Sequence, residues 1–224
     1  KEGIINRLYH IVRKRTLASK QRLVASATGV KQGKVLDIGC GTGAFLHAMQ
    51  TAGWSITGLE PDPSARTKAQ ELYAIRPEAP ARLFELPASS YQAITMWHVL
   101  EHVHDLHDYM MQIHTLLAPG GKLFIAVPNY TSGDANAYKE FWAAWDVPRH
   151  LYHFSPKSME RLLALHGLKL ETVRPMWFDS FYVSMLSEKY RGGNIVRAFM
   201  NGLLSNVQAI GNARKCSSVI YVIG

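Results

Sequence analysis

Residues 35–43 read Val-Leu-Asp-Ile-Gly-Cys-Gly-Thr-Gly, and this stretch limits the fold more than any other part of the chain. Four largely apolar residues before a glycine-rich stretch predict a buried strand that ends in a tight turn, and residues 44–49 then predict a helix. A turn of this kind presents backbone N–H groups at a helix N-terminus, where they bind an anionic group. We therefore expect Gly39, Gly41 and Gly43 to form part of a cofactor site.

Two carboxylates accompany the turn. Asp37 lies two residues before the first glycine, where its charge would attract an ammonium group and repel a pyrophosphate. Glu60 ends the next predicted strand, where a carboxylate accepts hydrogen bonds from a ribose diol. These features favour S-adenosylmethionine as cofactor and S-adenosylhomocysteine as product. Two alternatives stay open: a dinucleotide, because Gly39-x-Gly41-x-x-Ala44 also fits the relaxed dinucleotide pattern, and a tight turn that binds no ligand.

The glycine turn resembles motif I of the class I S-adenosylmethionine-dependent methyltransferases, in the branch that includes ubiquinone-biosynthesis-type enzymes. Further matching segments follow at 58–62, 98–103 and 116–123. The resemblance implies a Rossmann-like α/β fold with helices on both faces of a seven-stranded, mostly parallel sheet that has one antiparallel strand. It also implies transfer of a methyl group from S-adenosylmethionine to a small-molecule or lipid-like acceptor.

Alternating strand and helix patterns along the chain agree with such a sheet. The strands are predicted at 35–38, 55–60, 81–85, 91–97, 122–127, 168–174 and 217–223. In the family the last of these strands lies antiparallel between the two before it. We expect a basic N-terminal helical lid at 1–30 and a cofactor-binding domain at 31–224, with a substrate-side insertion at about 129–154 and a helical insertion at about 176–215.

The remaining cofactor contacts are predicted from the turn and from the ends of the strands. The motifs add Cys40 and Pro61 to the site, and we expect Glu85, Trp97 and His98 to border the adenosine. The chain departs from the family after the predicted third strand, where many members carry an aspartate for the adenine amino group. Here only Glu85 is acidic, so recognition of the adenine is the least certain part of the prediction.

The segment 138–154 contains six of the 23 aromatic residues of the chain. Because related enzymes place substrate walls at this point in the fold, an apolar or aromatic acceptor would suit it. His150 and His153 are the candidates for the general base, since histidine titrates near neutral pH, and His150 is preferred. The alternative is an aromatic cap over the edge of the sheet, with both histidines hydrogen-bonded to the backbone.

Four histidines, His98, His102, His104 and His107, lie close together in the sequence. Their order around Glu101 is not the His-Glu-x-x-His arrangement of zinc proteases. The segment also passes from a strand into a helix, so the side chains should point in different directions. We therefore expect no metal site.

The net charge of +8 comes entirely from residues 1–36, which contain nine Lys or Arg residues and one Glu. The expected interpretation is a solvated helix face, although Lys20 and Arg22 are candidates to reach the cofactor carboxylate. An RNA methyltransferase that uses this segment is an alternative function, and a non-catalytic cofactor-binding regulatory module is another. The neutral remainder of the chain argues against a nucleic-acid partner.

Two cysteines, Cys40 and Cys216, favour a reducing cytoplasm, because a disulfide between them would lock the glycine turn. We find no apolar run long enough for a transmembrane helix. The apolar residues of 195–210 are expected to pack in the core, the alternatives being a lid, a dimer face or a peripheral membrane contact. The sequence does not predict the oligomeric state.

Overall fold

The computed structural model describes the backbone of residues 4–224 and the side chains from Val12 onward. The chain divides into two compact units. The first unit consists of Lys1–Met96 and Gln112–Phe124, and the second unit consists of Trp97–Met111 and Ile125–Gly224.

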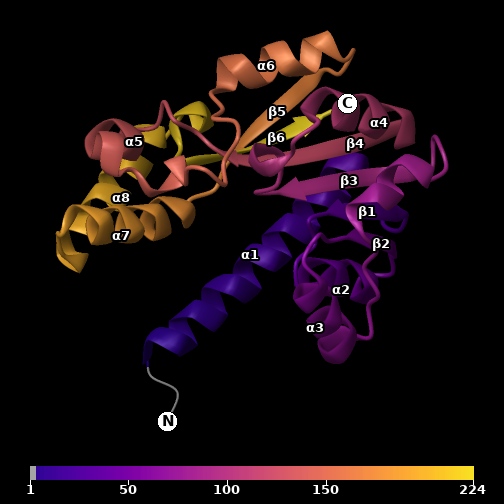
Figure 1. Cartoon of the computed structure of the whole chain (residues 1–224), viewed down its shortest axis with the longest axis horizontal. Coiled ribbons are helices and arrows are strands. Elements are labelled where there is room, and N and C mark those ends of the chain that lie inside the picture. Colours follow the sequence, from indigo (N-terminus) through magenta and orange to yellow (C-terminus); the bar gives the residue numbers. More distant parts are fainter. Residues whose placement is uncertain (1–3) are drawn as a thin grey trace. The chain divides into compact units, whose positions relative to one another are not determined.

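The α-helices are α1 Ile4–Thr28, α2 Ala44–Thr51, α3 Pro63–Tyr73, α4 Leu106–Leu116, α5 Gly133–Tyr138, α6 Pro156–Leu165, α7 Asp179–Arg191 and α8 Ile195–Ala209 (Figure 1). The strands are β1 Lys34–Ile38, β2 Ser55–Leu59, β3 Tyr91–Trp97, β4 Leu117–Pro128, β5 Leu170–Pro175 and β6 Ser218–Ile223. The 3₁₀-helices are η1 Pro80–Glu85, η2 Leu100–His102, η3 Lys139–Phe141, η4 Ala143–Trp145 and η5 Ala213–Lys215.

The strands form a mixed sheet in the order β2-β1-β3-β4-β6-β5. β1 pairs in parallel with both β2 and β3, so Asp37 lies opposite Gly58 on one side and Thr95 on the other. β6 lies between β4 and β5 and is antiparallel to β5, which confirms the expected position of the last strand. Parallel strands buried on both faces require long apolar runs, and Val35, Leu36 and Ile38 supply one in β1.

The predicted strand at 81–85 is wrong, and the sheet among the described residues has six strands instead of seven. Residues Pro80–Glu85 form the 3₁₀-helix η1, in which Leu83 alone is buried. The chain pairs with β2 only at an isolated bridge between Glu78 and Leu59. Pro77 and Pro80 flank that bridge, and a proline has no N–H to continue a ladder. One apolar side chain between two prolines is therefore too little to form a strand.

Helix α1 covers most of the segment predicted as a basic lid. Lys1, Glu2 and Gly3 lie outside the described residues, and so does the side chain of Arg7. Within the described part, the charge of Lys20 lowers the pKa of Asp37. Arg22 donates a hydrogen bond to the carbonyl of Ala18 in its own helix.

A buried carboxylate connects three elements of the second unit. Asp134 in α5 is fully buried and accepts hydrogen bonds from three neutral donors. Trp142 Nε1 donates at 2.8 Å, while Ser205 Oγ of α8 and Ser217 Oγ, just before β6, each donate at 2.7 Å. Each of these bonds is charge-assisted and lies away from water, so Asp134 holds α5, α8 and the start of β6 together.

Candidate functional site

The glycine turn of the first unit leaves β1 and enters α2. Gly39, Gly41 and Gly43 all adopt positive φ angles, of 71°, 55° and 77°. A Cβ on Gly41 would meet nothing within 4 Å, so its backbone borders open space that a ligand can approach. A Cβ on Gly43 would come within 3.2 Å of Ala69 Cβ, so this glycine lets α2 pack closely on α3. The turn thus has two of the features that a cofactor cradle needs: special dihedral angles and an open face.

Glu60 joins the end of β2 to this turn. Glu60 is 8% exposed, and its two carboxylate oxygens accept hydrogen bonds from the Gly41 N–H at 2.7 Å and the Asp62 N–H at 2.9 Å. Each carboxylate oxygen has a second lone pair, so the group can accept further hydrogen bonds from a diol. Arg66 holds the same corner by donating to the carbonyls of Glu60 and Pro61, and this places Pro61 beside the site.

Asp37 is a buried carboxylate at the end of β1. Its side chain is 2% exposed, and Thr95 Oγ1 donates a hydrogen bond to Oδ1 at 2.6 Å. Burial, with a smaller contribution from the charge of Glu60, raises the pKa of Asp37 to about 7, although the Thr95 hydrogen bond and the charge of Lys20 act in the opposite direction. A cationic ligand group would stabilise the ionised form, so this position suits the ammonium group of a methionine moiety.

Three other predicted cofactor residues have different surroundings. Cys40 lies buried in the turn, its N–H donates to the Leu59 carbonyl at 3.0 Å, and burial raises the pKa of its thiol. Glu85 lies in η1, where its exposed side chain forms an ion pair with Arg82. Trp97 is the last residue of β3. The structure therefore brings Asp37, the glycines and Glu60 together, whereas the carboxylate of Glu85 already has a cationic partner.

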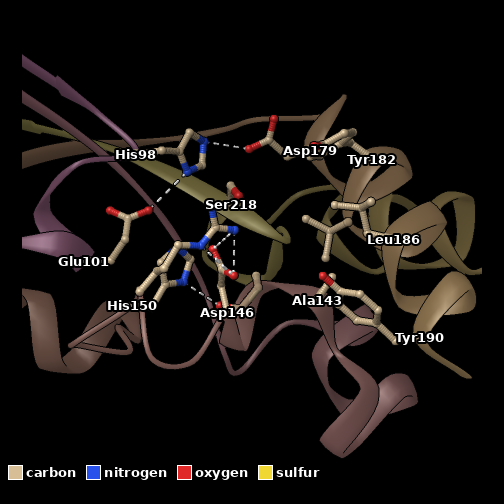
Figure 2. Close-up of a pocket in the computed structure, with 13 residues that line it drawn as sticks. His98, Glu101, Ala143, Asp146, His150, Asp179, Tyr182, Leu186, Tyr190 and Ser218 are labelled. Atoms are coloured by element: carbon tan, nitrogen blue, oxygen red, sulfur yellow. Dashed lines mark hydrogen bonds and ion pairs between the residues drawn. The ribbon is translucent and has the colours of Figure 1, made fainter. Parts of the chain in front are cut away.

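The second unit contains a pocket of about 380 Å³, large enough for a small organic molecule. One side of the pocket carries polar groups, which come from the segment after β3, from residues 143–150 and from the start of α7 (Figure 2). The other side carries apolar and tyrosine side chains of α7. The lining includes His98, Glu101, Asp146, His150, Asp179, Tyr182, Leu186 and Tyr190.

His98, predicted at the adenosine, lies in this pocket between two carboxylates (Figure 2). Its Nε2 is 2.8 Å from Asp179 Oδ2, and its Nδ1 is 3.4 Å from Glu101 Oε1. Burial alone would lower the pKa of His98, but the two carboxylates raise it above its ordinary value, so the imidazole is charged at neutral pH. Asp179 is not among the site residues predicted from the sequence, because no pattern there links it to a residue 81 positions earlier.

His150 also lines the pocket. Its Nδ1 is 2.8 Å from the carbonyl of Ala144, which fixes the proton on Nδ1 and leaves Nε2 as an acceptor. Nε2 lies 3.8 Å from Asp146 Oδ2. Burial lowers the pKa of His150, so the ring is neutral at neutral pH and can accept a proton.

His153 does not line the pocket. Its Nε2 is 2.9 Å from the carbonyl of Trp145, and its ring packs edge-on against that tryptophan, with ring centroids 4.8 Å apart. The six aromatic residues of 138–154 are also absent from the pocket wall. Tyr138 and Trp142 belong instead to a buried cluster of this unit, so the aromatic character of the wall comes from Tyr182 and Tyr190.

Glu101, His102 and His150 form a group with three ligand atoms that lie within 4.8 Å of one another. The Nδ1 atoms of both histidines lie near backbone carbonyls, His102 at 2.9 Å from that of Arg149, so both Nε2 atoms carry a lone pair. Among the described residues, the buried Glu101 carboxylate has an ion-pair partner in His98 Nδ1 at 3.4 Å, and its other oxygen accepts no hydrogen bond. Such a donor set can hold a divalent cation, whereas the sequence predicts no metal site.

Comparison with known proteins identifies the kind of protein to which this geometry belongs. Residues 9–173 match the methyltransferase domain family. The chain is 28% identical over 164 residues to the mitochondrial ubiquinone biosynthesis O-methyltransferase of Rattus norvegicus, a match that covers 66% of this chain and 48% of the relative. It is 29% identical over 161 residues to the ubiquinone biosynthesis O-methyltransferase of Xanthomonas axonopodis, covering 65% of this chain and 66% of the relative. The match thus spans about half the length of the mitochondrial relative.

A solved structure agrees with the fold. A SAM dependent methyltransferase from Archaeoglobus fulgidus superposes with a TM-score of 0.61 at 17% identity, covering 94% of this chain and 93% of that one. At this level of identity the likeness concerns the fold alone.

Proposed function

This chain belongs to the methyltransferase domain family and is an S-adenosylmethionine-dependent methyltransferase, and on this premise we propose that it methylates a small acceptor that has an apolar body and one proton-bearing polar group. The pocket of the second unit is the observation that carries the proposal. Its α7 side offers Tyr182, Leu186 and Tyr190 to an apolar body, and its other side offers His150 to a polar group.

In this proposal, the residues of the first unit hold the cofactor. Asp37 binds the methionine ammonium, Glu60 accepts the ribose hydroxyls, and the open face of Gly41 admits the ligand next to the backbone. Bound S-adenosylmethionine supplies an electrophilic methyl group. Positioning alone contributes roughly 7–11 kcal/mol to such a displacement when the reacting atoms are about 3–3.5 Å apart.

We assign His150 as the group that accepts the acceptor's proton. Its ring is neutral because burial lowers its pKa, and the Ala144 carbonyl keeps the proton on Nδ1. The Nε2 lone pair is therefore available at neutral pH. His153 is the weaker candidate, because its Nε2 faces the carbonyl of Trp145 and the ring lies away from the pocket wall. His98 is held as a cation between two carboxylates and cannot serve as the base.

The test is the release of S-adenosylhomocysteine with a panel of aromatic and lipid-like hydroxyl compounds. With an active acceptor, His150→Ala should lower kcat by roughly 10²–10⁴-fold, the range for loss of a general base. The exposed His114 on α4 provides a matched control, and His114→Ala should leave kcat unchanged. A proton acceptor at His150 needs no metal, so a chelator should not affect the rate. Loss of activity with a chelator and its return with a divalent cation would assign His150 to metal binding and contradict its role as the base.

A further inference from the structure

Helix α8 buries its small side chains and exposes its large apolar ones. Its buried positions are Ala198, Gly202, Ser205 and Ala209. A Cβ on Gly202 would come within 2.9 Å of the Phe181 ring and 3.1 Å of its Cα, so the helix packs against α7 as closely as a glycine allows. The exposed apolar residues are Ile195, Val196, Phe199, Met200, Leu203, Leu204 and Val207, with Ile210 just beyond the helix. Core packing, which we expected for 195–210, is therefore wrong for these side chains.

Helix α8 forms a helical hairpin with α7 (Figure 1). Tyr182 and Tyr190 of α7 are also exposed, but they line the pocket of the second unit and do not belong to this surface. The exposed apolar residues of α8, together with Ile210, form what we call the hairpin face. Proteins seldom leave so many large apolar side chains in water on one element, and a contiguous patch of this kind marks an interaction site. Something of apolar character should therefore cover the hairpin face.

The charges of the hairpin restrict what can cover it. Lys189, Arg191 and Arg197 are exposed where α7 passes into α8. The hairpin has two carboxylates: Glu188 is 2% exposed, and Asp179 forms an ion pair with His98. The exposed charges of residues 179–209 are thus all positive. A second copy of the chain, docked symmetrically through this face, would offer these cations no exposed carboxylate of its hairpin as a partner, whereas an anionic surface would attract them.

We propose that the hairpin face docks on the surface of a membrane that contains anionic lipid. The apolar residues of α8 would enter the boundary between headgroups and acyl chains, and Lys189, Arg191 and Arg197 would contact lipid phosphates, as in other interfacial amphipathic helices. No helix among the described residues is long and apolar enough to cross a membrane, so the contact is peripheral. The proposal depends on the apolar surface of α8 and on the three cations of the hairpin, and it is independent of the identity of the methyl acceptor.

Sedimentation with lipid vesicles tests the proposal. The full chain should bind vesicles of phosphatidylcholine mixed with phosphatidylglycerol, and bind vesicles of phosphatidylcholine alone much more weakly. Leu204→Glu should reduce binding at least about tenfold, because it places a charge within the apolar surface. Arg197→Gln should reduce binding to the mixed vesicles about fivefold, and added salt should do the same. Leu165→Glu is the matched control, since Leu165 on α6 is 74% exposed and lies outside the hairpin face.

Two further measurements keep the outcomes distinct. Each variant should bind S-adenosylmethionine as the wild type does, so failure of vesicle binding is separable from failure of the methyltransferase assignment. The tryptophan fluorescence of the wild-type chain, to which the 40% exposed Trp177 beside α7 contributes, should change on vesicle binding. The proposal is overturned if the wild-type chain does not bind the mixed vesicles at low salt, or if Leu204→Glu binds them equally well. A dimer that Leu204→Glu dissociates, without vesicle binding, would assign the face to a second copy of the chain.

Discussion

Replacing Asp37 by Asn should stabilise the cofactor-free protein and at the same time weaken cofactor binding. The raised pKa of Asp37, about 7 against 3.8 for an ordinary aspartate, means that the folded protein binds this proton more tightly than the unfolded chain does. The free energy of unfolding therefore falls as the pH rises from about 4 to about 7, and above about pH 7 the ionised Asp37 lowers it by the full amount. At about 1.4 kcal/mol for each tenfold difference in proton affinity, this amount is about 4 kcal/mol. An Asn side chain still accepts the Thr95 hydrogen bond but carries no charge.

Urea denaturation without cofactor measures this effect. Asp37→Asn should raise the free energy of unfolding by about 4 kcal/mol near pH 8 and by only about 1.5 kcal/mol near pH 5, where the wild-type carboxyl is largely protonated. The control is Glu71→Gln on the exposed side of α3, which should change little at either pH. In calorimetry, Asp37→Asn should bind S-adenosylmethionine at least about tenfold more weakly, because a charged hydrogen bond is lost. A variant no more stable than wild type near pH 8 would refute the burial argument, and unchanged affinity would refute the assigned role.

Two further substitutions test separate parts of the account. Glu60→Ala should weaken S-adenosylmethionine binding by about 10–150-fold, because it removes charged hydrogen bonds worth roughly 1.5–3 kcal/mol. Calorimetry measures this change, with Glu71→Ala as the control. Equal affinities of the two variants would contradict the role of Glu60. Asp134→Ala should lower the free energy of unfolding by about 3–5 kcal/mol, since three buried donors lose their acceptor. Urea denaturation against the exposed Glu140→Ala checks that value, and a loss below about 1 kcal/mol would show that the donors find other partners.

The cofactor half of the fold could be predicted because its signals are local. An apolar strand, three glycines with positive φ and a helix follow one another within residues 34–51, so sequence order nearly determines the geometry. The strand expected at 81–85 failed for a reason that is also local, since Pro77 and Pro80 restrict pairing to a single bridge at Glu78. A proline on each side of Glu78 therefore outweighs the strand pattern of 81–85.

The acceptor side could be predicted only in part, because its contacts join distant residues. The ion pair of His98 with Asp179 connects positions that no sequence pattern links. The apolar side chains of α8 predict a helix packed in the core, although its packing surface consists of residues as small as Ala198 and Gly202. Apolar periodicity identifies a face of a helix but does not determine whether that face is buried.

The most direct test of the account is calorimetric titration of the full chain with S-adenosylmethionine and S-adenosylhomocysteine, with NADH as the control ligand. The family and the site formed by Asp37, Gly41 and Glu60 predict micromolar binding of both sulfur compounds and no binding of NADH. Binding of NADH without binding of either sulfur compound would contradict the assignment of the glycine turn to S-adenosylmethionine.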